Sequence, residues 1–222
     1  MVSEGESGEA LAPQLAICTV AGYRNAGAMS DLDLVAQCRR GDTGAFDVLA
    51  GRYGQRLFHV AVRFLGNRED ALDICQEAFV RAYQSLDRYR GDAQFYTWLY
   101  SIAANLARNR LRDRSRKGRD KGTSLDALLE NAPAVAQAAA AAGRNPGTEA
   151  MEREMEEMLQ RCLEELPEHY RLPFVLRTFD DLSYDEIAEV MDCPAGTVKS
   201  RLNQARKLLR ERLRDLAILE AE

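Results

Sequence analysis

The chain has 222 residues, 46% of them hydrophobic, and a formal net charge of -5, with a sequence pI of about 5.3. This length accommodates one domain or two small ones, and the acidic balance excludes an indiscriminate coat for nucleic acid. No apolar run approaches the roughly 20 residues of a membrane-spanning helix, so we expect no insertion into a membrane.

The N-terminal segment and the cysteines predict a cytoplasmic protein without a metal site. Residues 1–28 are small and polar, so we expect a flexible tail rather than a signal peptide. The cysteines form no close pair, and with only two histidines in the chain they give no zinc-ligand spacing. We therefore expect buried free thiols in a reducing cytoplasm, and no cofactor. The five cysteines are Cys18, Cys38, Cys75, Cys162 and Cys193.

Three amphipathic helices are predicted in the first half of the chain. Ser30 or Asp31 can cap the first, which ends at Gly41. The second keeps apolar residues at three-or-four spacing over five turns, from Phe46 to Phe64. The third opens at residue 68 and buries one stripe as far as residue 86. Its solvent side carries polar residues that, taken alone, indicate only solubility: Asp73, Gln76 and Glu77.

A loop at 87–94 leads into a fourth predicted helix, from Phe95 to about residue 116. Five of the sixteen aromatic residues fall within twelve positions here. Such a cluster at helical spacing usually belongs to a core, whereas a loop aromatic between Arg88 and Arg90 can instead stack on an unpaired base. Both readings stay open. The stretch 105–121 carries eight basic residues against two acidic ones, which favours a polyanionic partner.

Residues 118–148 lose helical periodicity and contain prolines, glycines and an alanine run, which indicates a linker. Two further helices follow, at about 151–166 and 168–178. The fold class is therefore all-α, with two small helical domains joined by a flexible linker. The domains span 29–117 and 149–215, and a short C-terminal tail spans 216–222.

Residues 181–214 predict a helix-turn-helix. Ser183 is a natural N-cap for the first helix, and Asp192 tolerates the left-handed conformation that the turn needs. The second helix buries a stripe from Val198 to Leu213. The span 196–214 carries seven basic residues against one acid. A basic, hydrogen-bonding second helix is typical of those that enter a DNA major groove.

Two blocks of the sequence resemble a known family. DALDICQEAFVRAYQSLDRYRGDAQFYTWLYSIAANLARNRL is similar to region 2 of bacterial sigma factors. LEELPEHYRLPFVLRTFDDLSYDEIAEVMDCPAGTVKSRLNQARKLLRERL is similar to region 4. With only a linker between these blocks, the chain resembles an extracytoplasmic-function (group IV) sigma factor of the sigma-70 family.

The resemblance implies a role for each polar surface. Asp73, Gln76 and Glu77 would dock on the clamp helices of the RNA polymerase β′ subunit, and the β flap is a second implied contact of the polymerase. The residues implied for the −10 promoter element are Arg88, Tyr89, Arg90, Asp92, Asn105, Arg108 and Arg112. Those implied for the −35 element are Lys199, Ser200, Arg201, Asn203, Gln204 and Arg206.

The implied activity is promoter-directed initiation of transcription, with melting of the −10 element and no catalysis. The implied partners are core RNA polymerase, promoter DNA and an anti-sigma factor, with no small-molecule substrate. Two alternatives compete with this hypothesis. One is a helix-turn-helix regulator that works without polymerase docking, and the other is a sigma mimic that sequesters an anti-sigma factor. No acid/base pair, activated nucleophile or phosphate-binding glycine loop indicates an enzyme.

Overall fold

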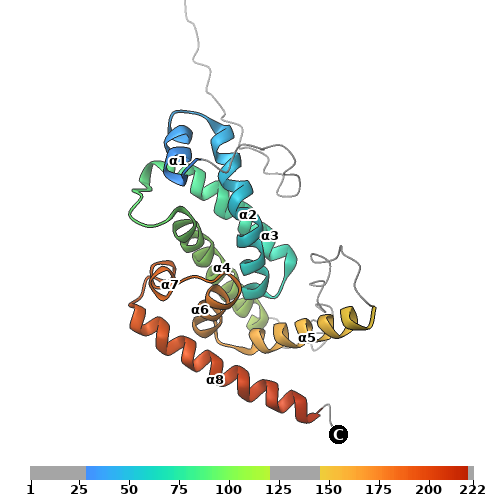
Figure 1. The fold of residues 1–222 in the computed structure, drawn as a ribbon. Coiled ribbons are helices and arrows are strands. Elements are labelled where there is room, and N and C mark those ends of the chain that lie inside the picture. Colours follow the sequence, from blue (N-terminus) through green and yellow to red (C-terminus); the bar gives the residue numbers. More distant parts are fainter. Residues whose placement is uncertain (1–28, 121–145, 220–222) are drawn as a thin grey trace, which may run out of the picture.

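The structure, a computed structural model, describes residues 29–120 and 146–219 and is helical in both parts (Figure 1). This confirms the all-α prediction. We call residues 29–120 the N-terminal module and residues 146–219 the C-terminal module. The elements of the first are α1 (Asp31–Arg39), α2 (Thr43–Leu65), α3 (Arg68–Gln84), the 3-10 turn η1 (Leu86–Arg88) and α4 (Phe95–Asp120). Those of the second are α5 (Pro146–Glu165), α6 (Glu168–Phe179), α7 (Tyr184–Met191) and α8 (Ala195–Leu219).

The first three helices of the N-terminal module begin at side-chain caps. The side chains of Ser30, Asp42 and Asn67 each accept a hydrogen bond from a backbone N–H in the first turn that follows, which satisfies a donor that the helix leaves unpaired. Gly66 ends α2 with φ +72. Glycine adopts this left-handed conformation without strain, and a Cβ at this position would also displace the Glu164 side chain on α5.

The N-terminal module is built around α2, which packs against α1, α3 and α4. Its apolar stripe meets aromatic side chains from the neighbouring helices: the ring of Phe46 lies edge-on to Phe79 on α3, and the ring of Tyr53 lies 5.8 Å from Phe95 on α4. These residues are buried. The predicted stripe of the second helix is therefore confirmed as core, and Phe79 and Phe95 pack against it.

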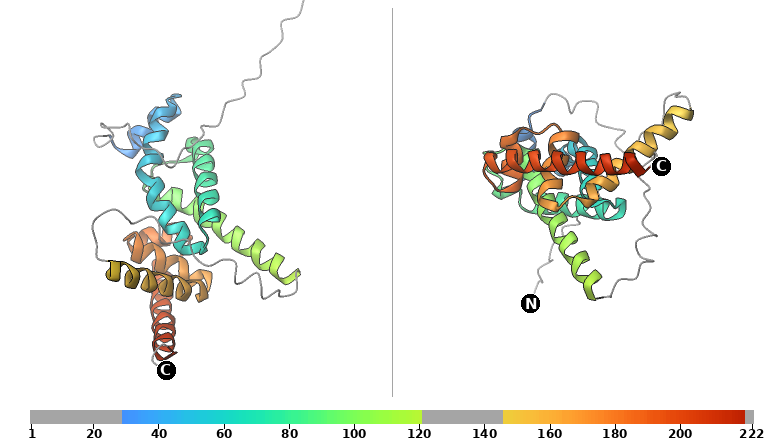
Figure 2. Two further views of the ribbon diagram at one scale, coloured as in Figure 1. Left: turned by 90° about the vertical axis from the view of Figure 1, so that its right-hand side faces the viewer. Right: turned by 90° about the horizontal axis from the view of Figure 1, so that it is seen from below.

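The C-terminal module stacks α6 and α7 on the long helix α8, which runs across the outer side of the module (Figure 2). The inner stripe of α8 is buried as predicted, through Val198, Leu202, Ala205 and Leu209. Helix α8 continues to Leu219, so residues 216–219 of the predicted C-terminal tail extend this helix.

The two modules share one hydrophobic core instead of standing apart. Helix α2 packs against α5 and α6, and α4 packs against α7. The predicted linker is shorter at both ends, because α4 runs to Asp120 and α5 begins at Pro146. Its central part, residues 121–145, lies outside the described residues, as does the predicted tail at 1–28. Side chains from both modules meet in this core: Leu57, Val60, Ala61, Tyr100, Leu172, Leu176 and Val190.

A buried arginine closes the junction of the modules. The Arg171 side chain on α6 donates to the carbonyl oxygen of Phe64 at 2.9 Å, near the end of α2, and to that of Leu166 at 2.9 Å. It also donates to the carbonyl of Glu164, near the end of α5. Arg171 is 8% exposed, and burial lowers the pKa of its guanidinium. One cation therefore satisfies carbonyls at the negative ends of two helices.

The cysteines in the described residues are unpaired. Cys38, Cys75 and Cys162 are buried, and burial raises the pKa of the first to about 11 and that of the second to about 12. Cys193 in the helix-turn-helix is partly exposed. The prediction of free thiols is confirmed for these four, whereas Cys18 lies outside the described residues.

Replacing Arg171 by leucine should lower the free energy of unfolding by about 2–4 kcal/mol, because three buried carbonyls lose their donor. Urea unfolding followed by circular dichroism measures this change. Arg161→Leu is the matched control, since Arg161 is exposed and its ion pair with Glu157, at 3.9 Å, is a surface pair. We expect a change of about 0.5 kcal/mol or less there, and equal losses in the two variants would contradict the role of Arg171.

Candidate docking and nucleic-acid surfaces

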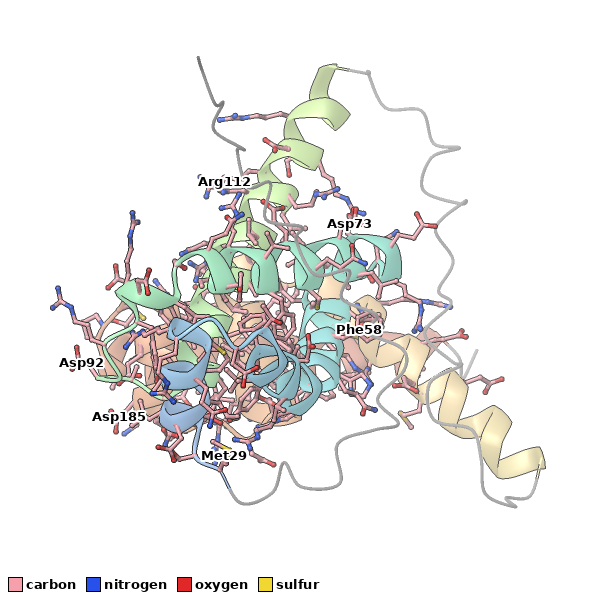
Figure 3. All side chains as sticks on the ribbon, turned by 90° about the horizontal axis from the view of Figure 1, so that it is seen from above. Met29, Phe58, Asp73, Asp92, Arg112 and Asp185 are labelled. Carbon is pink, nitrogen blue, oxygen red and sulfur yellow. The ribbon has the colours of Figure 1, made fainter. Side chains whose placement is uncertain are left out.

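The acidic face predicted for polymerase docking is accessible on α3. Asp73 and Gln76 are exposed and Glu77 is half-buried, and Figure 3 shows Asp73 on the outer side of the helix. Their spacing places the three side chains on one helical face. Asp73 lies 3.6 Å from Arg110 on α4, and Glu77 pairs with Arg81 one turn away. Both ion pairs are solvent-exposed, so both are weak and open to exchange with a partner.

The arginines of the basic helix α4 lie on two faces, one of which is turned toward Asp70 on α3. The Asp70 carboxylate pairs with Arg110 at 3.0 Å and also with Arg114. These two arginines, four residues apart, are therefore turned toward α3. Arg108 and Arg112 lie on a different face of the same helix, and Figure 3 shows Arg112 pointing outward. The sequence analysis missed this division, although the four-residue spacing within each pair is a signal for it.

The loop between η1 and α4 is held in place by hydrogen bonds from α1. Arg39 on α1 donates to the carbonyl oxygen of Leu86 at 2.7 Å and to that of Tyr89. Gly91 has φ +80, which glycine adopts without strain. This support leaves three predicted −10 residues exposed at the loop surface: Arg88, Arg90 and Asp92.

Tyr89 is a core residue, which settles the alternative that the sequence left open. Its side chain is 5% exposed, its ring lies 5.0 Å from Trp98 and 5.8 Å from Phe95, and its hydroxyl donates to the carbonyl of Ala93 at 2.7 Å. The burial of the ring favours the core interpretation, and the implied contact of Tyr89 with the −10 element stays a prediction. Tyr89 instead holds both ends of the loop.

The remaining predicted −10 residues lie along α4. Asn105 and Arg112 are exposed, and Arg108 is half-buried. Arg108 donates to Asn105 at 3.3 Å, and Arg112 donates to Asn109 at 2.8 Å. Burial lowers the pKa of Arg108, an effect opposed by the nearby charge of Glu168. In the described residues neither Arg108 nor Arg112 forms an ion pair, so both guanidinium groups are available to phosphate.

The predicted helix-turn-helix is confirmed, including the N-cap of its first helix and the residue at its turn. The Ser183 hydroxyl accepts from the backbone N–H of Glu186 at 3.2 Å, and the Glu186 carboxylate accepts from the N–H of Ser183 at 2.7 Å. This reciprocal capping box fixes the start of α7. Asp192 ends the helix with φ 50 in the left-handed region, where an aspartate is tolerated.

The second helix of this motif, α8, presents most of its predicted −35 residues to solvent. Lys199, Ser200, Asn203 and Arg206 are exposed, and Gln204 and Arg201 are half-buried. Ser200 donates to the carbonyl of Thr197 at 3.0 Å, which leaves its hydroxyl oxygen free to accept. Arg201 lies 3.8 Å from the sulfur of Cys193.

The half-buried Arg201 faces the N-terminal module. A cleft of about 610 Å³ separates α4 from the C-terminal module, and its lining includes Arg108, Arg201, Glu168 and His169. One predicted −10 residue and one predicted −35 residue therefore line the same cleft. No sequence pattern indicates this proximity, since the two arginines are 93 positions apart.

The described residues contain no cluster of His, Cys, Asp or Glu that could hold a metal ion. None of their helices is both long and apolar enough to cross a membrane.

Family models match both modules. The model for Sigma-70 region 2 matches residues 49–117, and the model for Sigma-70, region 4 matches residues 156–209. The RNA polymerase sigma-H factor of Pseudomonas aeruginosa is 40% identical over 187 residues, which cover 84% of this chain and 95% of that protein. The chain belongs to the sigma-70 family.

A second relative places this sigma factor in the extracytoplasmic-function group. It is the ECF RNA polymerase sigma-E factor of Escherichia coli, 38% identical over 188 residues, which cover 85% of this chain and 96% of the relative. The chain is therefore a factor for promoter-directed initiation of transcription by RNA polymerase. The matched segments contain the predicted docking surface, the loop before α4 and the helix-turn-helix.

Two solved structures share the fold of this sigma factor. CnrH, in complex with the cytosolic domain of CnrY, matches with a TM-score of 0.59 and 25% identity over 87% of this chain and 99% of that chain. The sigma factor RpoE of Bartonella quintana, in complex with the anti-sigma factor NepR, matches with a TM-score of 0.56 and 24% identity. This match covers 72% of this chain and 91% of that chain.

Asp192 offers a test of the turn geometry. Asp192→Gly should leave the free energy of unfolding unchanged or raise it by up to about 1 kcal/mol, because glycine adopts the left-handed region without cost. Asp192→Val should lower it by about 1–3 kcal/mol, because a β-branched side chain is strained there. Thermal unfolding compares the two variants, and a valine variant as stable as the glycine variant would contradict the assignment.

Proposed function

We propose that three surfaces divide the work of promoter recognition in this sigma factor. The acidic face of α3 binds the clamp helices of core polymerase through Asp73, Gln76 and Glu77. The loop before α4 and the free face of α4 engage the −10 element. The exposed face of α8 reads the −35 element. The observation that carries this proposal is the order of the two family matches along one chain, each coinciding with an accessible polar surface.

At the −10 element the protein must favour a melted state. Extruding a base from the duplex costs a few kcal/mol. The exposed Arg88 and Arg90 in the rigid loop offset this cost by binding the backbone, while Asn105, Arg108 and Arg112 hold the adjoining strand. Tyr89 contributes indirectly by fixing the loop. Asp92 lies at the exposed surface of the loop, where its carboxylate can accept a hydrogen bond from the amino group of a base.

At the −35 element the α8 face enters a major groove. Lysine and arginine suit guanine edges or phosphates and asparagine suits adenine, so Lys199, Arg201 and Asn203 are the proposed reading residues. Ser200, Gln204 and Arg206 complete the polar face. The chemistry is binding without catalysis, and it takes place where polymerase works, in the cytoplasm.

We further propose that an anti-sigma factor regulates the chain. The support is the similarity to CnrH, a chain solved in complex with the cytosolic domain of CnrY. The β flap of polymerase is the proposed contact of the C-terminal module. Two observations disfavour the alternative functions. A helix-turn-helix regulator that works without polymerase docking has no use for a region 2 module, and a sigma mimic has no use for the basic face of α8.

Transcription in vitro tests the proposal. Core polymerase is incubated with fragments of the organism's own genomic DNA, with and without the chain, and the 5′ ends of the transcripts are sequenced. We expect a set of start sites that depends on the chain and shares two upstream elements. Transcript ends that do not change when the chain is added would exclude the function.

The double substitution Asp73→Ala with Gln76→Ala should weaken binding to core polymerase about tenfold, because partner hydrogen bonds on α3 are lost. Competition between the variant and the wild-type chain for core polymerase measures the loss of affinity. Thermal stability should hold, since Arg110 keeps its stronger pair with Asp70. Unchanged affinity for polymerase would show that the docking surface lies elsewhere.

Two arginines on α4 provide a matched contrast. Arg112→Ala should weaken promoter binding by the reconstituted holoenzyme and reduce its salt dependence by about one unit, because a phosphate contact is lost. Arg114→Ala should leave the salt slope unchanged, because Arg114 pairs with Asp70. Filter binding at several salt concentrations reports both slopes. An equal effect of the two substitutions would contradict the division of α4 into two faces.

A further inference from the structure

Helix α1 contacts the loop before α4 through the guanidinium of Arg39. This side chain donates to the carbonyl oxygen of Leu86 from Nε, at 3.2 Å, and from Nη2, at 2.7 Å. Nη2 also donates to the carbonyl oxygen of Tyr89. One cation on α1 therefore holds both ends of the turn that contains Arg88. Hydrogen bonds from a charged donor are stronger than those between neutral groups.

A second contact from α1 lies on the other side of the exposed loop arginines. Gly91 takes φ +80, and a Cβ built on it would lie 2.9 Å from the side chain of Leu32. The Leu32 side chain therefore lies directly against the backbone of the loop. Leu32 and Arg39 stand at opposite ends of α1, so together they bracket the segment that carries Arg90.

Helix α1 has a fixed position, whereas the loop has no regular structure of its own. Leu34 and Val35 on α1 are each 2% exposed, and Asp31 accepts a hydrogen bond from the Tyr53 hydroxyl on α2. Residues 89–94 form no helix, so no repeated backbone hydrogen bonds fix them. The position of the loop is therefore set by its side-chain contacts with a rigid neighbour.

We propose that Arg39 is a positioning residue for the −10 element, which acts by holding the loop and makes no contact with DNA itself. This role rests on the proposed function, because it takes Arg88 and Arg90 as contacts to the opened strand. A mobile loop loses conformational freedom when it binds, and a loop already held in place avoids that loss. Arg39 therefore favours the melted −10 element, although it precedes the segment that matches region 2, residues 49–117.

Two adjacent arginines on α1 provide a charge-matched pair of variants. Arg39→Met removes the donors to the loop and keeps a long, unbranched side chain that suits a helix. Arg40→Met makes the same change in net charge, and Arg40 is exposed at the end of α1. Both variants keep the face of α3 that carries Asp73, so both should bind core polymerase as the wild type does.

Amide exchange in the free chain, measured by NMR, reports on the loop without reference to any activity. The reporters are the N–H groups of Arg88 and Tyr89, which donate to the carbonyl oxygens of Ser85 at 2.9 Å and Leu86 at 3.1 Å. Both should exchange about tenfold faster in the first variant and at the wild-type rate in the second. Amides in the middle of α2 should exchange alike in all three proteins. Equal exchange of the reporters in all three would overturn the proposal.

If Arg39→Met also accelerates exchange in α2, Arg39→Lys replaces it. Lysine keeps the charge but offers one nitrogen in place of the planar fork of the guanidinium. The two reporters should then exchange at least about threefold faster than in the wild type. Wild-type rates in this variant would overturn the proposal.

Promoter opening by the reconstituted holoenzyme gives the second readout. The template is a promoter recovered from the chain-dependent start sites, with 2-aminopurine in its −10 element, whose fluorescence rises on melting. We expect the equilibrium constant for opening to fall about fivefold with Arg39→Met and less than twofold with Arg40→Met. Wild-type opening by the Arg39 variant, or equal losses in the two variants, would overturn the proposal.

The two readouts together separate positioning from a direct contact with DNA. A loss of opening with Arg39→Met while the reporter amides exchange at the wild-type rate would mean that Arg39 binds DNA itself, which would overturn the proposal. If chain-dependent start sites were absent but the exchange difference held, only the proposed function would fail.

Discussion

The arrangement of the molecule depends on a single buried cation at the junction of three helices. Arg171 reaches from α6 to carbonyl oxygens near the ends of α2 and α5. Each of these helix ends carries partial negative charge and unpaired acceptors, which burial would otherwise make costly. Gly66 lies at the same junction, where a Cβ would displace the Glu164 side chain. The two modules are thereby joined by hydrogen bonds from one side chain to backbone carbonyl oxygens of both.

Helix periodicity separates the basic residues that form internal ion pairs from those that face solvent. On α4 the arginines four residues apart divide between an internal partner and solvent: Arg110 and Arg114 neutralise Asp70, while Arg112 stays free of acidic partners in the described residues. The internal pairs join α4 to α3. An acidic chain can in this way carry a local phosphate-binding surface without becoming a non-specific polycation.

Local features of this chain were predictable from sequence, and contacts between distant segments were not. Ser183 and Asp192 act through neighbours within four positions, so their cap and turn could be assigned from residue type alone. The helical stripes follow the same logic. Tyr89 could not be decided, because its burial depends on Trp98 and on the support of Arg39 from α1. The shared core of the modules was missed because the linker composition suggested independence, whereas the apolar faces of α2 and α6 were compatible with packing on each other.

Apolar contact also holds the two modules together. Separating them would expose the side chains of Leu57 and Val60 on α2 and of Leu172 and Leu176 on α6, and each methylene exposed to water costs about 0.8 kcal/mol. The apolar contact and the hydrogen bonds of Arg171 therefore stabilise the same junction, the first through burial and the second by satisfying carbonyl oxygens that would otherwise be buried without a donor.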